Sequence, residues 1–156
     1  MKPRHEPQRR ALLTGLIGAV VVPGVGAQPN AQGAELSAQA WIDQLTQGQS
    51  VREGRVELTL PRLADNGLSV PLQVRMPSPM TAQEHVRQIC LVSMRNPRPL
   101  MARFELGPHS GRAEVATRVR LNGSQQVVAL VQMSDLTWWS ATTEVEVTES
   151  ACLDAS

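Results

Sequence analysis

Residues 114–133 read EVATRVRLNGSQQVVALVQM, and this stretch decides the fold class of the chain. Alternate residues from Val115 to Leu121 are apolar or threonine, the period of two expected of a strand with one buried face. Asn122-Gly123 is a strong turn signal. The near-continuous apolar run at residues 126–133 predicts a strand that is buried on both faces. The stretch as a whole therefore predicts β-structure.

The same kinds of segment recur along the chain between Pro- and Gly-containing turns. Further strands are predicted at residues 55–60, 68–75, 86–94, 100–106 and 138–148. Pro71 removes a backbone donor from its strand, which predicts an edge position or a bulge there. Residues 34–47 have helical spacing and end before Gly48. We therefore expect an all-β fold, an immunoglobulin-like β-sandwich of about seven strands with a short N-terminal helix.

Aromatic residues are 3% of the chain, so the core must be built mainly from valine, leucine and methionine. Trp138 and Trp139 are adjacent within a predicted strand, where successive side chains point to opposite faces. We expect one ring in the core and the other on the surface, in preference to a binding platform.

The N-terminal segment predicts export. Basic residues precede an apolar stretch at residues 12–22, and Val25-Gly26-Ala27 offers a small-x-small cleavage site. Arg9-Arg10 has the form of a twin-arginine signal, the alternative being a chance pair in an ordinary secretory signal. The apolar stretch is short and ends at Pro23, which argues against a membrane span.

Four segments follow from these signals. Residues 1–27 are a twin-arginine-type signal peptide, and residues 28–50 are a linker with the N-terminal helix. Residues 51–148 form the immunoglobulin-like domain. Residues 149–156 form a flexible C-terminal arm that carries Cys152.

Charge excludes one class of partner. The full chain has 15 basic and 14 acidic residues, and removal of the signal leaves 11 and 13. A nearly neutral domain without a basic stripe is a poor candidate for nucleic-acid binding.

Two cysteines allow one disulfide or two free thiols. Cys90 lies in an apolar strand, where we expect a buried, unpaired side chain. Cys152 lies four residues from the C-terminus. It is an incidental terminal residue, half of a Cys90–Cys152 disulfide, or a reactive group on a tether. A free thiol has a pKa of about 8.5, so a few per cent is ionised near neutral pH.

No enzyme constellation is found in the sequence. His85 and His109 lack a serine or cysteine partner at a recognisable spacing, and the chain has no zinc-site or phosphate-loop pattern. We expect no metal, no cofactor and no catalytic activity. Arg118 and Arg120 share a strand face, with Arg103 as a candidate third member. These arginines form either a patch that binds an anion or a partner protein, or an ordinary solvated face of the sheet.

Several short segments, in this order and spacing, resemble the SoxY family, the sulfur-carrier subunits of the periplasmic thiosulfate-oxidising (Sox) complex. They are Asp65-Asn66-Gly67 with Val70-Pro71, Ser78-Pro79-Met80-Thr81, His85-Val86, Asn96-Pro97-Arg98-Pro99, Thr117-Arg118-Val119-Arg120-Leu121, Gln125-Gln126-Val127-Val128-Ala129 and Met133-Ser134-Asp135.

The resemblance implies an immunoglobulin-like periplasmic carrier with Cys152 as the covalent sulfur attachment site. It implies a heterodimer with a SoxZ-like immunoglobulin-fold subunit. The implied pathway partners are a c-type cytochrome that loads the thiol, a hydrolase that releases sulfate, and a sulfur dehydrogenase. On this reading the protein itself is not an enzyme.

The tail departs from the family pattern. The family tail is Gly-Gly-Cys-Gly-Gly, whereas this chain ends in Ser150-Ala151-Cys152-Leu153-Asp154-Ala155-Ser156. Glycines keep such an arm slim and freely rotating, and here a branched and an acidic residue follow the thiol. The alternative to a carrier is therefore a divergent paralogue that acts as a periplasmic binding or structural module.

Overall fold

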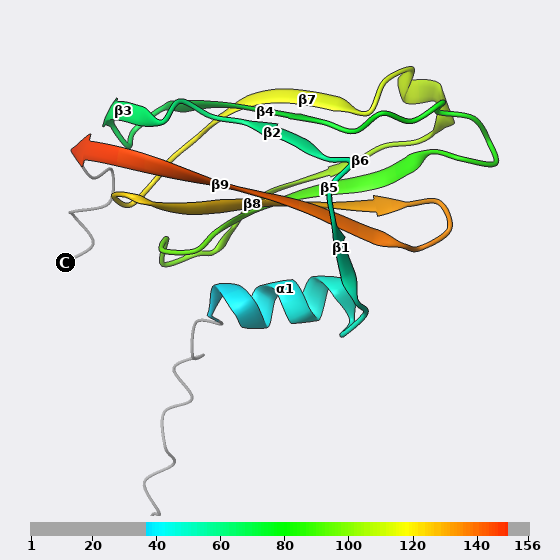
Figure 1. The fold of residues 1–156 in the computed structure, drawn as a ribbon, viewed down its shortest axis with the longest axis horizontal. Coiled ribbons are helices and arrows are strands. Elements are labelled where there is room, and N and C mark those ends of the chain that lie inside the picture. Colours follow the sequence, from blue (N-terminus) through cyan, green and yellow to red (C-terminus); the bar gives the residue numbers. More distant parts are fainter. Residues whose placement is uncertain (1–36, 150–156) are drawn as a thin grey trace, which may run out of the picture. The chain divides into compact units, whose positions relative to one another are not determined.

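A computed structural model describes residues 37–149 of the chain. These residues form two β-sheets packed face to face, with one helix against the outside of the larger sheet (Figure 1). The expected all-β sandwich with a short N-terminal helix is confirmed. The expected signal peptide at residues 1–27 lies outside the described residues. So do residues 150–156 of the expected C-terminal arm, which include Cys152.

Helix α1 spans Ala38–Thr46. The side chain of Ser37 accepts a hydrogen bond from the backbone N–H of Ala40 at its start, as an N-cap does. The helix ends where Gln47 adopts a left-handed conformation, and Gly48, the predicted stop signal, also has positive φ.

The larger sheet has six strands in the order β1-β9-β8-β5-β6, with β3 paired to β9 beside this path. Its strands are β1 (Val51–Glu53), β3 (Leu63–Asn66), β5 (Val86–Ser93), β6 (Leu100–Glu105), β8 (Gln125–Met133) and β9 (Trp138–Glu149). The central strands β5, β8 and β9 pair antiparallel, whereas β1 and β3 run parallel to β9.

The smaller sheet has the order β2-β4-β7, formed by Glu57–Thr59, Val70–Arg75 and Glu114–Val119. A short 3-10 turn at Pro108–Ser110 lies on the connection from β6 to β7. Residues 37–149 therefore contain nine strands in place of the expected seven or so. The two unexpected strands, β1 and β3, are only three and four residues long.

Pro71 lies on β4, which is the central strand of the smaller sheet, and this corrects the expected edge or bulge. Its β7 partner is Arg118, but the pairing of β2 with β4 ends at Thr59 and Gln73. On the β2 side Pro71 therefore has no strand neighbour in the described sheet. The absence of a backbone N–H at Pro71 therefore costs no hydrogen bond to β2.

The core has two layers, one on each face of the larger sheet. The inner layer fills the space between the sheets and includes Val74, Leu91 and Val127. The outer layer lies between the sheet and α1 and includes Cys90 and Trp138. Strands β5 and β8 contribute to both layers, which explains why their sequences are almost continuously apolar.

Candidate functional site

Strand β9 is the last described element before Cys152, the candidate attachment site. β9 reaches Glu149, whose carbonyl oxygen accepts a 2.7 Å hydrogen bond from the N–H of Gly67. The hydroxyl of Thr148 donates to the carbonyl of Asp65. Strand β3 pairs with this part of β9 up to Asn66 and Glu149. The base of the C-terminal segment is therefore tied to the Asp65-Asn66-Gly67 motif.

A second motif closes the same end of the sandwich. The Oδ1 atom of Asn96 accepts from the N–H of Asn122 at 2.8 Å, and its Nδ2 donates to the carbonyl of Arg120 at 2.8 Å. Buried Gln125 donates to Asn96 and accepts from the hydroxyl of Ser93. The loop after β5 is thereby joined to the turn between β7 and β8.

Large apolar side chains are exposed near this end. Leu63 and Leu68, which flank the β3–β9 pairing, are 57% and 56% exposed, and Met94 follows β5 with 39% exposed. Exposed apolar residues mark a surface that contacts other proteins where they form a contiguous patch, whereas single ones are common on any protein surface.

Cys90 is confirmed as a buried, free thiol. It lies on β5 under helix α1, where none of its surface is exposed. Burial raises the pKa of this thiol, and the neighbouring Arg103 guanidinium offsets that effect only in part. In the folded protein the thiolate of Cys90 is therefore rarer than that of a free cysteine at the same pH.

We predict that iodoacetamide at about pH 8 leaves Cys90 unmodified in the native protein and alkylates it after unfolding in guanidinium. Peptide mass spectrometry measures the modified fraction at each cysteine. Equal native labelling of Cys90 and Cys152 would contradict this assignment.

The raised pKa of Cys90 also makes the stability of the fold depend on pH. The neutral thiol contributes stability that is present below the unfolded pKa of about 8.5. That contribution is lost as the pH rises through the folded pKa.

The arginine set divides between the two sheets. Arg118 and Arg120 follow one another on the exposed face of β7 and just beyond it, as expected. Arg103 lies on β6, opposite Cys90 and close enough to affect its thiol. Arg103 therefore does not share a face with Arg118 and Arg120, and the expectation that it joins them is wrong.

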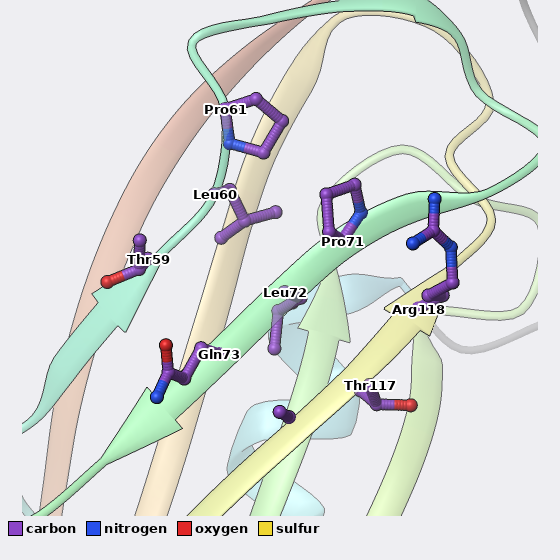
Figure 2. Close-up of a pocket in the computed structure, with 9 residues that line it drawn as sticks. Thr59, Leu60, Pro61, Pro71, Leu72, Gln73, Thr117 and Arg118 are labelled. Carbon is purple, nitrogen blue, oxygen red and sulfur yellow. The ribbon is translucent and has the colours of Figure 1, made fainter.

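A hollow of about 660 Å³ lies on the outer face of the smaller sheet (Figure 2). It opens where Leu60 and Pro61 leave β2 and Pro71 continues along β4. Two of its polar side chains form hydrogen bonds: Gln73 donates to Glu114 at 2.7 Å, and Arg118 donates to the hydroxyl of Ser69 at 2.7 Å. The residues that line the hollow include no cysteine, histidine or carboxylate.

The remaining candidates are structural. Trp138 is 2% exposed in the core beneath α1, as expected for one ring of the pair. Trp139 is half-buried, and the guanidinium carbons of Arg52 and Arg55 lie 5.6 and 5.1 Å from its ring centroid. Trp139 also packs against the inner core layer, so the second ring is covered by core residues and by cations instead of lying on an open surface.

His85 uses its Nδ1 to contact the carbonyl oxygen of Thr81 at 2.9 Å, and His109 is exposed in the 3-10 turn. Within residues 37–149 no group of three or more His, Cys, Asp or Glu side chains is placed to hold a metal ion. In the same range no helix has the length and apolar character needed to cross a membrane.

Solved structures share this fold. The chain is similar to the sulfur carrier protein SoxY from Chlorobium limicola f thiosulfatophilum, with 25% identity and a TM-score of 0.58 over 69% of this chain and 88% of that one. It also matches a superoxide reductase (neelaredoxin) from Ignicoccus hospitalis, with 20% identity and a TM-score of 0.54 over 60% and 80%. The latter likeness shows the fold alone. A search of curated proteins finds no match.

The family comparison covers most of the chain. The model of the sulfur oxidation protein SoxY matches residues 42–152, from helix α1 to the C-terminal cysteine. The matched range contains the motif segments at the end of the sandwich and both cysteines. Taken with the shared fold of the Chlorobium carrier, this match shows that the chain belongs to the SoxY family of sulfur oxidation proteins.

Proposed function

We propose that this protein is a periplasmic sulfur carrier that holds thiosulfate-derived intermediates on Cys152. Family membership gives the coarser statement directly: the chain has a carrier role in sulfur oxidation and belongs to the Sox complex. The assignment of Cys152 as the attachment site rests on the extent of the family match, which reaches residue 152.

The burial of Cys90 supports this choice of thiol. The chain has two cysteines, and Cys90 is enclosed between β5 and α1. Its raised pKa makes it a poor nucleophile and a poor attachment point. Cys152 is then the candidate for covalent loading. Three residues beyond Glu149 span at most about 10 Å, so a partner enzyme must approach the end of β9.

The proposed chemistry loads the thiol, releases sulfate and then oxidises the sulfur that remains. A thiol and thiosulfate form a sulfur–sulfur bond, which gives Cys–S–S–SO₃⁻ and releases one proton and two electrons to a c-type cytochrome. Water then cleaves the terminal sulfonate in a hydrolase, which releases sulfate and a proton and leaves Cys–S–SH. In a sulfur dehydrogenase the outer persulfide sulfur then reacts with three water molecules and gives six electrons to that enzyme and seven protons to solvent, which leaves Cys–S–SO₃⁻ for hydrolysis to sulfate and the free thiol. The carrier supplies the thiol, and its partners supply the catalysis.

Partner docking at the base of the arm is supported by the exposed apolar residues near the end of β9. Leu63, Leu68 and Met94 present a contact surface next to the place where the chain leaves the sheet. The rigid pairing of β3 with β9 would hold this surface in constant relation to the start of the arm. A SoxZ-like immunoglobulin-fold subunit completes the proposed heterodimer.

The intact mass of the exported protein tests the proposal. The protein is purified without reductant from cells that grow on thiosulfate, and the terminal peptide is mapped separately. We expect sulfur-containing adducts on the peptide with Cys152, and their loss on reduction. A bare Cys152 while the pathway is active would instead favour the non-carrier binding module.

A further inference from the structure

The two long sides of the sandwich differ in how they are closed. On the β9 side, β3 pairs with β9, the N–H of Glu146 donates to the carbonyl of Arg62 at 2.8 Å, and Thr143 donates to the carbonyl of Leu58 at 3.3 Å. On the opposite side, β6 ends the larger sheet and β7 ends the smaller one. These two strands are not paired to each other in the described sheets (Figure 1).

Strand β7 is an unpaired edge in the described part of the chain. Its six residues pair with β4 in unbroken register, from Glu114 with Arg75 to Val119 with Val70. It contains no proline, and no bulge interrupts it, two of the devices that usually protect an edge strand. The β5–β6 ladder, in contrast, shifts register between Leu91 and Val92. The outward N–H and C=O groups of β7 have no strand partner among residues 37–149.

Apolar side chains line the opening between the two edges. Met101 and Phe104 of β6 and Val115 of β7 pack against the inner core but remain partly exposed. A groove of about 270 Å³ runs between the edges, with Met101 and Ala102 on one wall and Val119 on the other. A segment that covered this groove would remove additional apolar surface from water.

Three arginines border the same groove. Arg98, Arg118 and Arg120 are exposed, and no carboxylate is among the groove residues. None of the three forms a salt bridge within the part of the chain that the structure describes. Arg118 donates from Nε and Nη2 to Ser69, the residue before β4, so its guanidinium is already held on the β4 side of the strand. The opening is therefore electrostatically complementary to carboxylates, which form strong charge-assisted hydrogen bonds with guanidinium groups.

We propose that the β7 edge binds an extended, acidic segment of a partner protein by strand addition. The partner strand pairs with the backbone of β7, its apolar residues cover the groove, and its carboxylates contact Arg98 and Arg120. Successive side chains of a strand point to opposite faces, so apolar and acidic residues alternate along the partner strand. This surface does not involve Cys152 and is independent of the proposed carrier chemistry.

The chain's own acidic strand is a poor occupant of this edge. Glu144 and Glu146 alternate along β9 in the required way. In this strand, however, Val145 pairs with Gln125 of β8 and Glu146 pairs with Leu63 of β3. A second copy could not offer that segment without opening its larger sheet. Strand β9 of a second copy is therefore excluded as the occupant, and the proposed partner is a different protein.

The test uses the exported full-length protein and a capped nine-residue peptide of alternating valine and glutamate. A peptide with lysine in place of glutamate is the matched probe. We expect the glutamate peptide to shift the amide resonances of residues 114–119 and to slow their hydrogen exchange, whereas the lysine peptide leaves them unchanged. Binding should weaken as salt is added.

Charge reversal tests the arginines. The double variant Arg98→Glu/Arg120→Glu should lose affinity for the glutamate peptide at least tenfold. The control Arg87→Glu/Arg112→Glu changes two exposed arginines outside the groove and should bind within twofold of the unchanged protein. Arg120→Gln alone should give a smaller loss if the double variant does not fold. Absent or displaced resonance shifts, equal binding of both peptides, or self-association through residues 114–119 would overturn the proposal.

Discussion

Replacement of Cys152 with serine is expected to abolish sulfur loading while the protein remains folded. A serine hydroxyl cannot form the sulfur–sulfur bond to thiosulfate, so the adducts on the terminal peptide should disappear completely. The melting temperature should change by no more than about 2–4 °C, because a substitution close to a chain end usually removes little packing. Intact mass and thermal unfolding of the exported variant measure both outcomes.

Cys90→Ala is the matched control for that experiment. The variant loses a small buried side chain under α1, so we expect destabilisation of about 1 kcal/mol. Its sulfur loading should match that of the unchanged protein. Normal loading of Cys152→Ser, or loss of loading in a folded Cys90→Ala variant, would contradict the assignment of the attachment site.

The largest expected effect on stability is that of Trp138→Ala. The indole of Trp138 is 2% exposed and packs in the cluster that joins the larger sheet to Ile42 and Leu45 of α1. Its removal leaves a cavity that rigid neighbours cannot fill, which costs about 3–5 kcal/mol. For a domain of this size we expect the melting temperature to fall by roughly 10–20 °C.

Trp139→Ala is the control, since the two tryptophans are adjacent on β9 and point to opposite faces. Trp139 is half-buried, packs against the inner core layer and lies near Arg52 and Arg55, so its loss should cost about 1–3 kcal/mol. Hydrogen exchange in α1 should accelerate in the Trp138 variant and remain unchanged in the Trp139 variant. Unchanged exchange in α1 of the Trp138 variant would contradict the outer core layer between α1 and the sheet.

Much of the fold could be predicted from local patterns. The alternation in residues 114–121 corresponds to β7, and the apolar run at 126–133 corresponds to the doubly buried strand β8. The short helix was predicted from its spacing and from Gly48. These predictions hold because the period of two and the period of 3.6 report directly which side chains face a core.

Other features depended on partners that are distant along the chain. Strands β1 and β3 are too short for a recognisable alternation, and each forms only because β9 is available beside it. Pro71 is tolerated in a central strand because β2 diverges at that point. Arg103 faces Cys90, away from Arg118, because β6 and β7 belong to different sheets.

The candidate site divides in the same way. Sequence alone determined the all-β class, the buried character of Cys90 and the position of Cys152 at the end of the chain, because composition and periodicity are local properties. Only the tertiary structure decided which loops surround the end of β9, which side of the sandwich stays open, and which arginines border it. Those features arise from strand pairing between distant segments, whose free energy comes from contacts that no local pattern records.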